Sequence, residues 1–338
     1  MPAIPGVPVN VLVAPDSFKG TFTAAEVAEA LGSGMRAAGA VVDACPVGDG
    51  GEGTLAALRD ALEVEIETAP AHDPLGREIE AAFGLIAGRR GRPAEAVVEV
   101  AAASGLGLVN EGDRDPIAAS TCGTGELILA AVAAGAEVVY VAVGGSATTD
   151  GGAGAIRAIR AGGGLGRARV IVLCDVRTAF EDAARVFAPQ KGADAKAVAV
   201  LTRRLGALAR RLERDPRGVP MTGAAGGLSG GLWAALGADL VPGASFVLDA
   251  IGFDARMRTA RAVVAGEGKL DSQSLVGKAV SEVATRARQA GVPCYAVAGR
   301  AELDRFGQRI LDLQAVLTAS TRRELEQAGQ DLAGLIFG

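Results

Sequence analysis

Short apolar runs alternate with helix-like segments along almost the whole chain, and this alternation limits the possible folds more than any other feature. The apolar runs are short and rich in β-branched residues, which is typical of buried strands. Strands are expected at 9–14, 41–44, 63–68, 81–86, 96–101, 138–143, 170–174, 262–265, 295–298 and 316–317. Helical periodicity predicts helices at 23–38, 53–62, 124–134, 151–160, 195–213 (the longest) and 278–289, and one more at the C-terminal end. Repeated alternation of this kind predicts an α/β fold with a largely parallel sheet.

The length and composition fit a globular protein with more than one domain. The chain has 338 residues, of which 49% are hydrophobic and only 4% aromatic, so its core must consist mainly of Ala, Val, Leu and Ile. At about 100–200 residues per domain, two domains are expected. A nucleic-acid-binding protein would normally be basic or carry a basic stripe, so the net charge of −5 argues against that class.

The cysteines and the single histidine narrow the possible chemistry. None of the four cysteines belongs to a Cys-x-x-Cys pair, which argues against a zinc site or a disulfide framework and fits a reducing cytoplasm. The only histidine, His72, is expected in an exposed or structural position, so a general base is expected to be Asp or Glu. The longest apolar stretch, 127–136, is about half as long as a membrane span, and residues 1–10 lack the pattern of a signal peptide. A soluble, cytoplasmic protein is expected.

Five glycine-rich or polar clusters follow expected strands. They lie at 14–20, 48–54, 144–152, 223–228 and 266–273, the last continuing to Lys278. Ligands of open α/β sheets bind at the carboxyl ends of strands, and glycines let a ligand approach the backbone closely. The Asp and Glu residues within the clusters suit a phosphate that binds together with Mg²⁺. Gly48, Gly50 and Gly53 formally match a dinucleotide-binding fingerprint, so an NAD-dependent oxidoreductase is a weaker alternative, and the chain has no Walker-type nucleotide motif.

Ten short motifs, in order over nearly the whole chain, resemble those of the type I glycerate kinases. They are 11–20 (VLVAPDSFKG), 49–54 (DGGEGT), 101–106 (AAASGL), 124–127 (TGEL), 144–148 (GGSAT), 150–152 (DGG), 174–176 (CDV), 189–192 (PQKG), 223–228 (GAAGGL) and 266–268 (GEG). The resemblance implies the glycerate kinase I fold, with two α/β domains around a cleft, one flavodoxin-like and one restriction-endonuclease-like. It also implies an ATP-dependent kinase that uses Mg²⁺ to phosphorylate a hydroxyl of D-glycerate, with the 2-position favoured.

This resemblance gives candidate roles to residues of the motifs. Asp175 is a candidate general base or metal ligand, and Lys19 and Asp16 are further catalytic candidates. Substrate or phosphate binding is expected of Ser17, Asp49, Gly50, Gly51, Glu52, Thr124, Ser146, Lys191 and Lys278, and metal binding of Glu267, Asp271 and Asp150. Structural alternatives remain open, because such polar residues also cap helices and close turns, and because lysines also occur as loop charges.

Three departures from the family pattern surround the strand that precedes Asp175. Thr149 stands where the family usually has Asn, and the segment between Gly154 and Val170 is shorter than in typical members. Residues 177–185 lack the expected Asn-Pro and Gly-Pro-Asn-Gly pattern. A catalytically impaired relative that binds glycerate or a nucleotide without turnover is therefore an alternative.

The two expected domains are discontinuous in the sequence. Residues 1–84 and 257–338 are expected to form one α/β domain, in which the strand at Tyr295 shares a sheet with the first strand, and residues 85–256 an inserted α/β domain. The reason is that the ligand-binding clusters must converge on one site, and that chain ends often share a domain. The protein is expected to be a monomer or a homodimer, with small molecules rather than nucleic acid or membrane as its partners.

Overall fold

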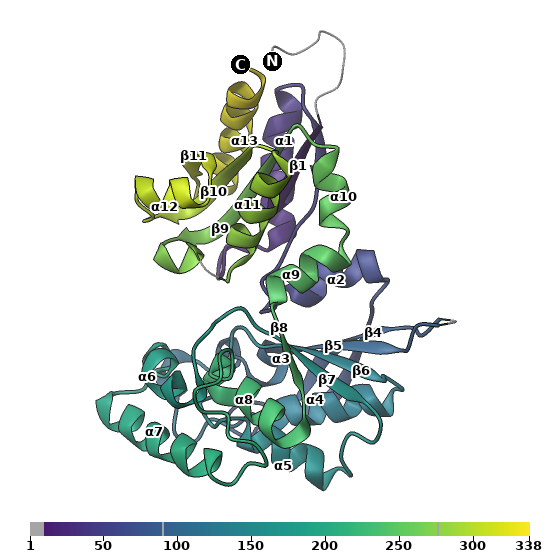
Figure 1. Ribbon diagram of the computed structural model, residues 1–338, viewed down its shortest axis with the longest axis vertical. Helices are drawn as coiled ribbons and strands as arrows, with labels where there is room; N and C mark the ends of the chain where they lie inside the picture. The colour runs from purple at the N-terminus through teal and green to yellow at the C-terminus, as the bar shows by residue number, and fades with distance from the viewer. Residues whose placement is uncertain (1–9, 90, 276) are drawn as a thin grey trace. The chain divides into compact units, whose positions relative to one another are not determined.

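The structure of the protein is a computed structural model, which describes residues 10–89, 91–275 and 277–338 (Figure 1). The chain divides into two compact units. The first unit contains the segments up to Asp49 and from Ala244 onward, and the second unit contains Gly50–Gly243. Each unit has its own sheet and its own hydrophobic core.

The first unit is built on a parallel five-stranded sheet in the order β11-β10-β9-β1-β2. Its strands are β1 (Asn10–Pro15), β2 (Val41–Ala44), β9 (Ala262–Leu270), β10 (Cys294–Ala301) and β11 (Leu313–Thr318). Its helices are α1 (Ala24–Ala37), α9 (Gly243–Ala250), α10 (Phe253–Arg258), α11 (Ala279–Ala290), α12 (Arg305–Ile310) and α13 (Arg322–Phe337). Residues of α1 and α13 share one core with Val11 and Val13 of β1, while α11 packs against β9 and β10. Parallel sheets are normally buried by helices in this way.

Local sequence signals explain how α1 begins and how it packs. Thr23 and Glu26 form a capping box: the Thr23 hydroxyl accepts a hydrogen bond from the Glu26 amide, and the Glu26 carboxylate accepts one from the Thr23 amide. Gly34 faces the backbone of α13, where a Cβ atom would overlap the carbonyl oxygen of Glu326. The missing side chain therefore allows the two helices to approach closely.

The second unit has a six-stranded sheet in the order β3-β4-β5-β6-β7-β8. The strands are β3 (Glu65–His72), β4 (Glu78–Ile86), β5 (Glu95–Glu99), β6 (Val138–Ala142), β7 (Arg169–Leu173) and β8 (Asp239–Val241), and β5 to β8 run parallel. The helices are α2 (Thr54–Leu62), α3 (Val100–Ser104), α4 (Cys122–Ala133), α5 (Ala153–Ala161), α6 (Ala183–Phe187), α7 (Ala195–Ala209) and α8 (Ala224–Leu236). Within the described ranges of both units, no helix combines the length and the apolar character needed to span a membrane.

The α/β fold is confirmed, and β1 and β10 lie in one sheet as the sequence predicted. Val9, expected to begin the first strand, lies outside the described residues. The helix expected at 195–213 ends at Ala209, and the chain then turns so that Arg214 stacks over the Trp233 ring at 5.0 Å. In the described part of the chain the longest helix is instead α13, with 16 residues. β9 continues to Leu270, five residues beyond the prediction, because its end pairs with Arg300 and Ala301 of β10.

The ranges of the two units differ from the predicted 1–84 plus 257–338 and 85–256. β4 pairs with both β3 and β5, which places residues 65–86 in the sheet of the second unit. On the other side, α10 belongs to the first unit. Its Arg256 holds the end of β2, with Nε 3.0 Å from a carboxylate oxygen of Asp43 and Nη2 2.7 Å from the Ala44 carbonyl oxygen.

Candidate active site

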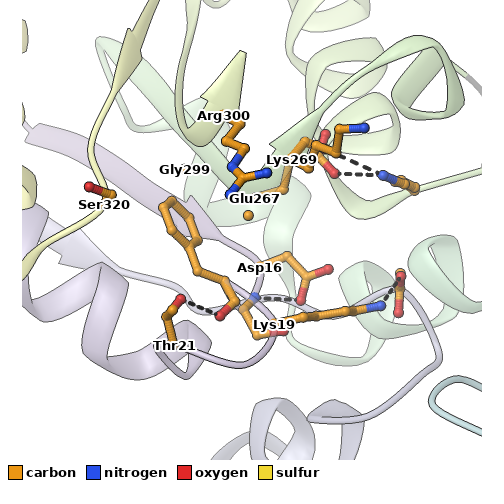
Figure 2. A pocket seen from close by; sticks show the side chains of 13 residues that line it. Asp16, Lys19, Thr21, Glu267, Lys269, Gly299, Arg300 and Ser320 are labelled. Carbon is orange, nitrogen blue, oxygen red and sulfur yellow. Dashed lines mark hydrogen bonds and ion pairs between the residues drawn. The ribbon is translucent and has the colours of Figure 1, made fainter. Parts of the chain in front are cut away.

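A cavity of about 430 Å³ opens in the first unit beside the carboxyl ends of β1 and β9 (Figure 2). Parallel strands end at the same edge of a sheet, so residues distant in sequence meet here. Three carboxylates and four cationic side chains are among the lining residues: Asp16, Asp49, Glu267, Lys19, Lys269, Lys278 and Arg300. The first and fifth clusters of the sequence, together with Asp49 of the second, therefore contribute to one cavity.

Asp16 is a deeply buried acid of this cavity. It follows β1 directly, its side chain is 7% exposed, and the Ser17 amide donates a hydrogen bond of 2.6 Å to its Oδ1. Burial raises the pKa of Asp16 to about 8, and the nearby Asp49 carboxylate acts in the same direction, while Lys19 partly opposes both. Without a ligand, this environment therefore favours the protonated form of Asp16, and a bound cation would favour its charged form.

Lys19 extends from a tight loop after β1. The loop is held by the pairing of the buried Phe18 with Phe22, whose backbone groups bond in both directions, and by a 2.7 Å hydrogen bond from the Thr21 hydroxyl to the Phe18 carbonyl. The Lys19 side chain is 58% exposed, and its Nζ lies 3.5 Å from the Asp49 carboxylate. A hydrogen-bonded loop thus places a partly exposed cation at the wall of the cavity.

Glu267 and Lys278 form an ion pair in the same cavity. Glu267 lies in β9 and is buried, with one carboxylate oxygen 3.1 Å from Lys278 Nζ. Its other oxygen, Oε1, is buried and receives no hydrogen bond. Burial raises the pKa of Glu267, while the Lys278 ammonium lowers it. Lys278 is the N-cap residue of α11.

The remaining two cations of the cavity are neighbours across β9 and β10, where Lys269 and Arg300 are register partners. Lys269 is paired with Asp271 at 3.2 Å and with Glu302 at 2.9 Å. Asp271 itself does not line the cavity. Burial raises the pKa of Asp271, but the hydrogen bond from the Gln273 amide and the pairing with Lys269 outweigh this effect, so the net shift of the pKa is downward. The sequence did not mark Arg300, because it lies outside every glycine-rich cluster and beyond the strand predicted to end at residue 298.

In the second unit, the second and third clusters meet at the carboxyl edge of the sheet. The Gly50 carbonyl accepts a 2.9 Å hydrogen bond from the Val143 amide, and a Cβ atom at Gly144 would lie 2.5 Å from the Gly51 Cα atom. The Glu52 side chain lies beside Gly145. Asp175 follows β7 at the same edge and is partly exposed. These glycine-rich loops and Asp175 form a second candidate binding surface.

Asp150 and Thr124 have structural contacts within the second unit. Both carboxylate oxygens of Asp150 accept hydrogen bonds, from the amides of Thr121, Gly152 and Gly154 at 3.0 Å each and from the Thr121 hydroxyl. Asp150 thus fixes the beginning of α5 to that of α4. Thr124 is fully buried and donates a 2.8 Å hydrogen bond to the Ser104 hydroxyl.

Lys191 is buried behind the third cluster. Its side chain donates hydrogen bonds to the Ser146 hydroxyl at 2.9 Å and to the Thr148 carbonyl oxygen. Burial lowers the pKa of Lys191 to about 7, with Asp150 acting in the opposite direction. Lys191 therefore supports the loop that carries Ser146, with its ammonium group inside the protein.

The fourth cluster does not follow a strand, contrary to the sequence-based expectation. It opens α8, and Ala225, Gly226 and Gly227 have positive φ angles of 49°, 65° and 90°. A Cβ atom at Gly226 would overlap the Thr148 carbonyl. These glycines are needed because the start of α8 packs closely against the backbone of the third cluster.

The three predicted metal ligands are divided between the two units. Glu267 and Asp271 belong to the first unit, and Asp150 belongs to the second. Among the residues that the structure describes, no group of three or more His, Cys, Asp or Glu side chains is arranged to hold a metal by itself. His72 has a structural place as expected: its Nδ1 lies 2.8 Å from a carboxylate oxygen of Glu126.

Sequence comparison links the chain to one family over nearly its full length. The model of the glycerate kinase family matches residues 11–165 and 160–336. The glycerate kinase of Bacillus subtilis is 39% identical over 336 residues, which cover 88% of this chain and 86% of that protein. The glycerate 2-kinase of Escherichia coli is 36% identical over 328 residues, which cover 86% of this chain and 85% of that protein.

A solved structure gives the same result for the fold. The crystal structure of a protein described as glycerate kinase 2, from Salmonella typhimurium, matches this chain with a TM-score of 0.79 at 31% sequence identity. The match covers 98% of each chain. Both units of the present structure therefore have counterparts in that protein.

Proposed function

The chain belongs to the glycerate kinase family, and we propose that it transfers the γ-phosphoryl group of ATP to a hydroxyl of D-glycerate, with the 2-hydroxyl as the acceptor and Mg²⁺ as the metal. The observation that carries this proposal is the cavity of the first unit, where Asp16, Lys19, Asp49 and Glu267 of the family motifs meet Lys278. The two alternative functions, an NAD-dependent oxidoreductase and a relative that binds without turnover, are not favoured by a comparable set of side chains.

The charges of the cavity match what phosphoryl transfer requires, which is mostly positioning and charge stabilisation. Lys19 and Lys278 supply cations that can move from their carboxylate partners to phosphate oxygens. Asp16, once ionised, can accept the proton of the attacking hydroxyl. Asp175, at the sheet edge of the second unit, is the other candidate for this proton or for a metal contact, and substitution separates the two carboxylates.

The acidic side chains of the cavity fit a Mg²⁺ ion. The Glu267 Oε1 atom has no hydrogen bond, and the pKa of Asp16 is raised to about 8 by burial and by Asp49, so negative charge is poorly compensated here. Mg²⁺ commonly takes only one or two protein carboxylates and completes its shell with phosphate oxygens and water. Glu267 or Asp49 would hold it, beside Asp16, which is the candidate proton acceptor. When bound, Mg²⁺ would neutralise charge on the phosphates.

The second unit is proposed to bind the remaining phosphate or substrate groups through its glycine-rich loops. Gly50, Gly51, Glu52 and Ser146 lie at one sheet edge, where backbone amides can approach an anion closely. Thr124, Asp150 and Lys191 are proposed to position these loops rather than to touch the ligands. We further propose a cytoplasmic protein, either a monomer or a homodimer, that acts on small molecules.

A coupled assay of ADP formation tests the function directly. The full-length protein is incubated with Mg-ATP and D-glycerate, and ³¹P NMR of the product distinguishes 2-phosphoglycerate from 3-phosphoglycerate. We expect turnover that requires both D-glycerate and a divalent cation, and that stops in excess chelator. Binding of D-glycerate without turnover would favour the impaired relative, and binding of NAD(H) without kinase activity would favour the oxidoreductase.

A further inference from the structure

We propose that Arg300 binds the carboxylate of the acceptor substrate and so selects an organic acid over a neutral polyol. The inference rests on the proposed kinase function and assigns to it a specificity-determining residue. Arg300 lies near the end of β10, and Figure 2 shows its side chain directed into the cavity. It thus faces the space in which an acceptor would meet Asp16.

The pairing of charges in the cavity leaves Arg300 as the cation that is available to an incoming anion. Lys19 is 3.5 Å from Asp49, Lys278 is 3.1 Å from Glu267, and Lys269 pairs with acids outside the cavity. Among the described residues, none forms a hydrogen bond or ion pair with the Arg300 guanidinium. An arginine with no partner, directed into a cavity, is suited to binding a ligand anion without first breaking an internal ion pair.

The backbone segments beside Arg300 are packed closely against one another at the wall of the cavity. A Cβ atom at Gly299 would lie 2.6 Å from the Gly268 carbonyl oxygen, and one at Gly268 would lie 3.2 Å from the Phe18 Cα atom. The glycines therefore allow the ends of β9 and β10 and the loop after β1 to lie close together, with the Phe18 side chain beside them. A small acid can lie in the cavity with its carboxylate at Arg300 and its hydroxyl group toward Asp16.

The chemistry favours a carboxylate over a phosphate at this position. The guanidinium group is planar and offers paired N–H donors that match the two oxygens of a carboxylate. A phosphate of ATP shares this chemistry, but Lys19 and Lys278 already supply point charges for phosphates nearer to the carboxylates that would hold Mg²⁺. Arg300, which forms no ion pair with any described residue, is left for the carboxylate.

Kinetics with charged and neutral acceptors test the inference. Arg300→Met is compared with the wild type for KM of D-glycerate, KM of Mg-ATP, and kcat/KM with the neutral analogue glyceramide. We expect kcat/KM for D-glycerate to fall by about 10- to 100-fold, the loss typical of a hydrogen bond to a charged group. KM for Mg-ATP and the low activity with glyceramide should not change, and Arg300→Lys should recover part of the loss.

Arg309→Met is the matched control, because Arg309 is an exposed arginine on α12 that does not line the cavity. Thermal unfolding of each variant verifies the fold. A rise in KM for Mg-ATP with unchanged KM for D-glycerate would overturn the inference in favour of a phosphate site. Unchanged constants for both substrates would also overturn it, while the kinase function would stand. If the wild type neither turns over nor binds D-glycerate by calorimetry, the proposed function fails as well.

Discussion

The raised pKa of Asp16 makes the chemistry of this residue depend on pH. A general base must be ionised to accept a proton, and burial together with the Asp49 carboxylate raises the pKa of Asp16 to about 8. We therefore expect kcat/KM, measured at low Mg²⁺ concentration, to increase with pH up to about 8. Because a cation favours the carboxylate form, a higher Mg²⁺ concentration should move this rising limb of the pH–rate profile to lower pH.

Asp16→Asn removes the titrating group, so the pH-dependent limb should vanish and kcat should fall by about 10²- to 10⁴-fold, as for loss of a general base. Asp331→Asn, at an exposed position of α13, serves as the control and should match the wild type. Rates recorded from pH 6 to 9 provide the measurement. A limb that persists in Asp16→Asn would show that another group titrates.

Lys191 links pH to the stability of the second unit. The pKa of its side chain is lowered by burial from 10.5 to about 7 in the folded protein. Between these values the unfolded chain binds more protons than the folded one, so the contribution of Lys191 to stability is present above about pH 10 and is lost as the pH falls through 7. We expect Lys191→Met to flatten the increase in the free energy of unfolding between about pH 7 and 10.

Urea unfolding at several pH values measures this effect, with Lys196→Met as the control at an exposed position of α7. Parallel pH profiles for the wild type and Lys191→Met would mean that Lys191 does not change its protonation on folding. The comparison uses slopes rather than absolute stabilities, because the substitution also removes hydrogen bonds to Ser146 and the Thr148 carbonyl.

The sequence indicated which residue types gather at the candidate site, but it could not indicate how their hydrogen bonds are used. Asp16, Lys19 and Asp49 line the predicted kind of cavity. Asp150 and Lys191 have the same chemical character, yet their polar atoms bind neighbouring loops, which depends on tertiary contacts. For single residues, the motif gives the location, and only burial and hydrogen bonding distinguish a ligand-binding role from a positioning role.

At the level of elements, the existence of the strands was predicted better than the residues at which they end. β9 was expected to stop before Gly266, because glycine is unfavourable in strands, but it continues to Leu270. The structure explains the exception: a Cβ atom at Gly266 would lie 3.0 Å from the Cβ atom of Pro15, so glycine allows β1 and β9 to lie close together. Cross-strand packing thus overrides the local preference, and this information is absent from a single segment.

Close packing of α1 on α13 gives a prediction for the first unit. A Cβ atom at Gly34 would overlap the Glu326 carbonyl oxygen, and neither helix backbone can yield without disturbing the shared core. We expect Gly34→Ala to lower the free energy of unfolding by about 1–3 kcal/mol, as in other overpacked cores. Gly334→Ala in α13 is the matched control, because a Cβ atom there meets nothing within 4 Å.

The same substitution should have opposite effects at the two positions. At position 334, where a Cβ atom has room, alanine has a higher helix propensity than glycine, so Gly334→Ala should add about 0.5–1 kcal/mol to the free energy of unfolding. Chemical unfolding curves of both variants measure the difference. Equal effects at positions 34 and 334 would contradict the close approach of the two helices.

For the whole molecule, the chain leaves the first unit after β2 and returns to it at α9. The sequence predicted this return, since β1 and β10 were expected in one sheet. The expected inserted domain, 85–256, begins and ends later in the chain than the second unit, Gly50–Gly243. The first unit's N-terminal segment ends at Asp49, and the pairing of β4 with β5 shows that residues 65–86 belong to the second unit. Long-range strand pairing of this kind is set by tertiary structure, which a local pattern cannot encode.

Whether both units take part in the chemistry can be tested at Asp175. It follows β7 at the carboxyl edge of the second sheet, the position where α/β proteins bind ligands. If Asp175 accepts the hydroxyl proton, the nearly isosteric Asp175→Asn should keep the fold and the binding of ATP, while kcat falls by about 10²- to 10⁴-fold. If Asp175 contacts Mg²⁺ instead, the apparent affinity for the metal should weaken, and added Mg²⁺ should restore part of the rate.

Asp215→Asn is the control for this experiment, because Asp215 is an exposed aspartate of the same unit that pairs with Arg217. Steady-state rates at several Mg²⁺ concentrations separate the two roles, and calorimetry with ATP verifies binding. Retention of more than about half of kcat in Asp175→Asn would exclude both roles and leave Asp16 as the proton acceptor. A loss in Asp175→Asn together with a loss in Asp16→Asn would instead require that carboxylates of both units act in one reaction, since neither sheet carries both residues.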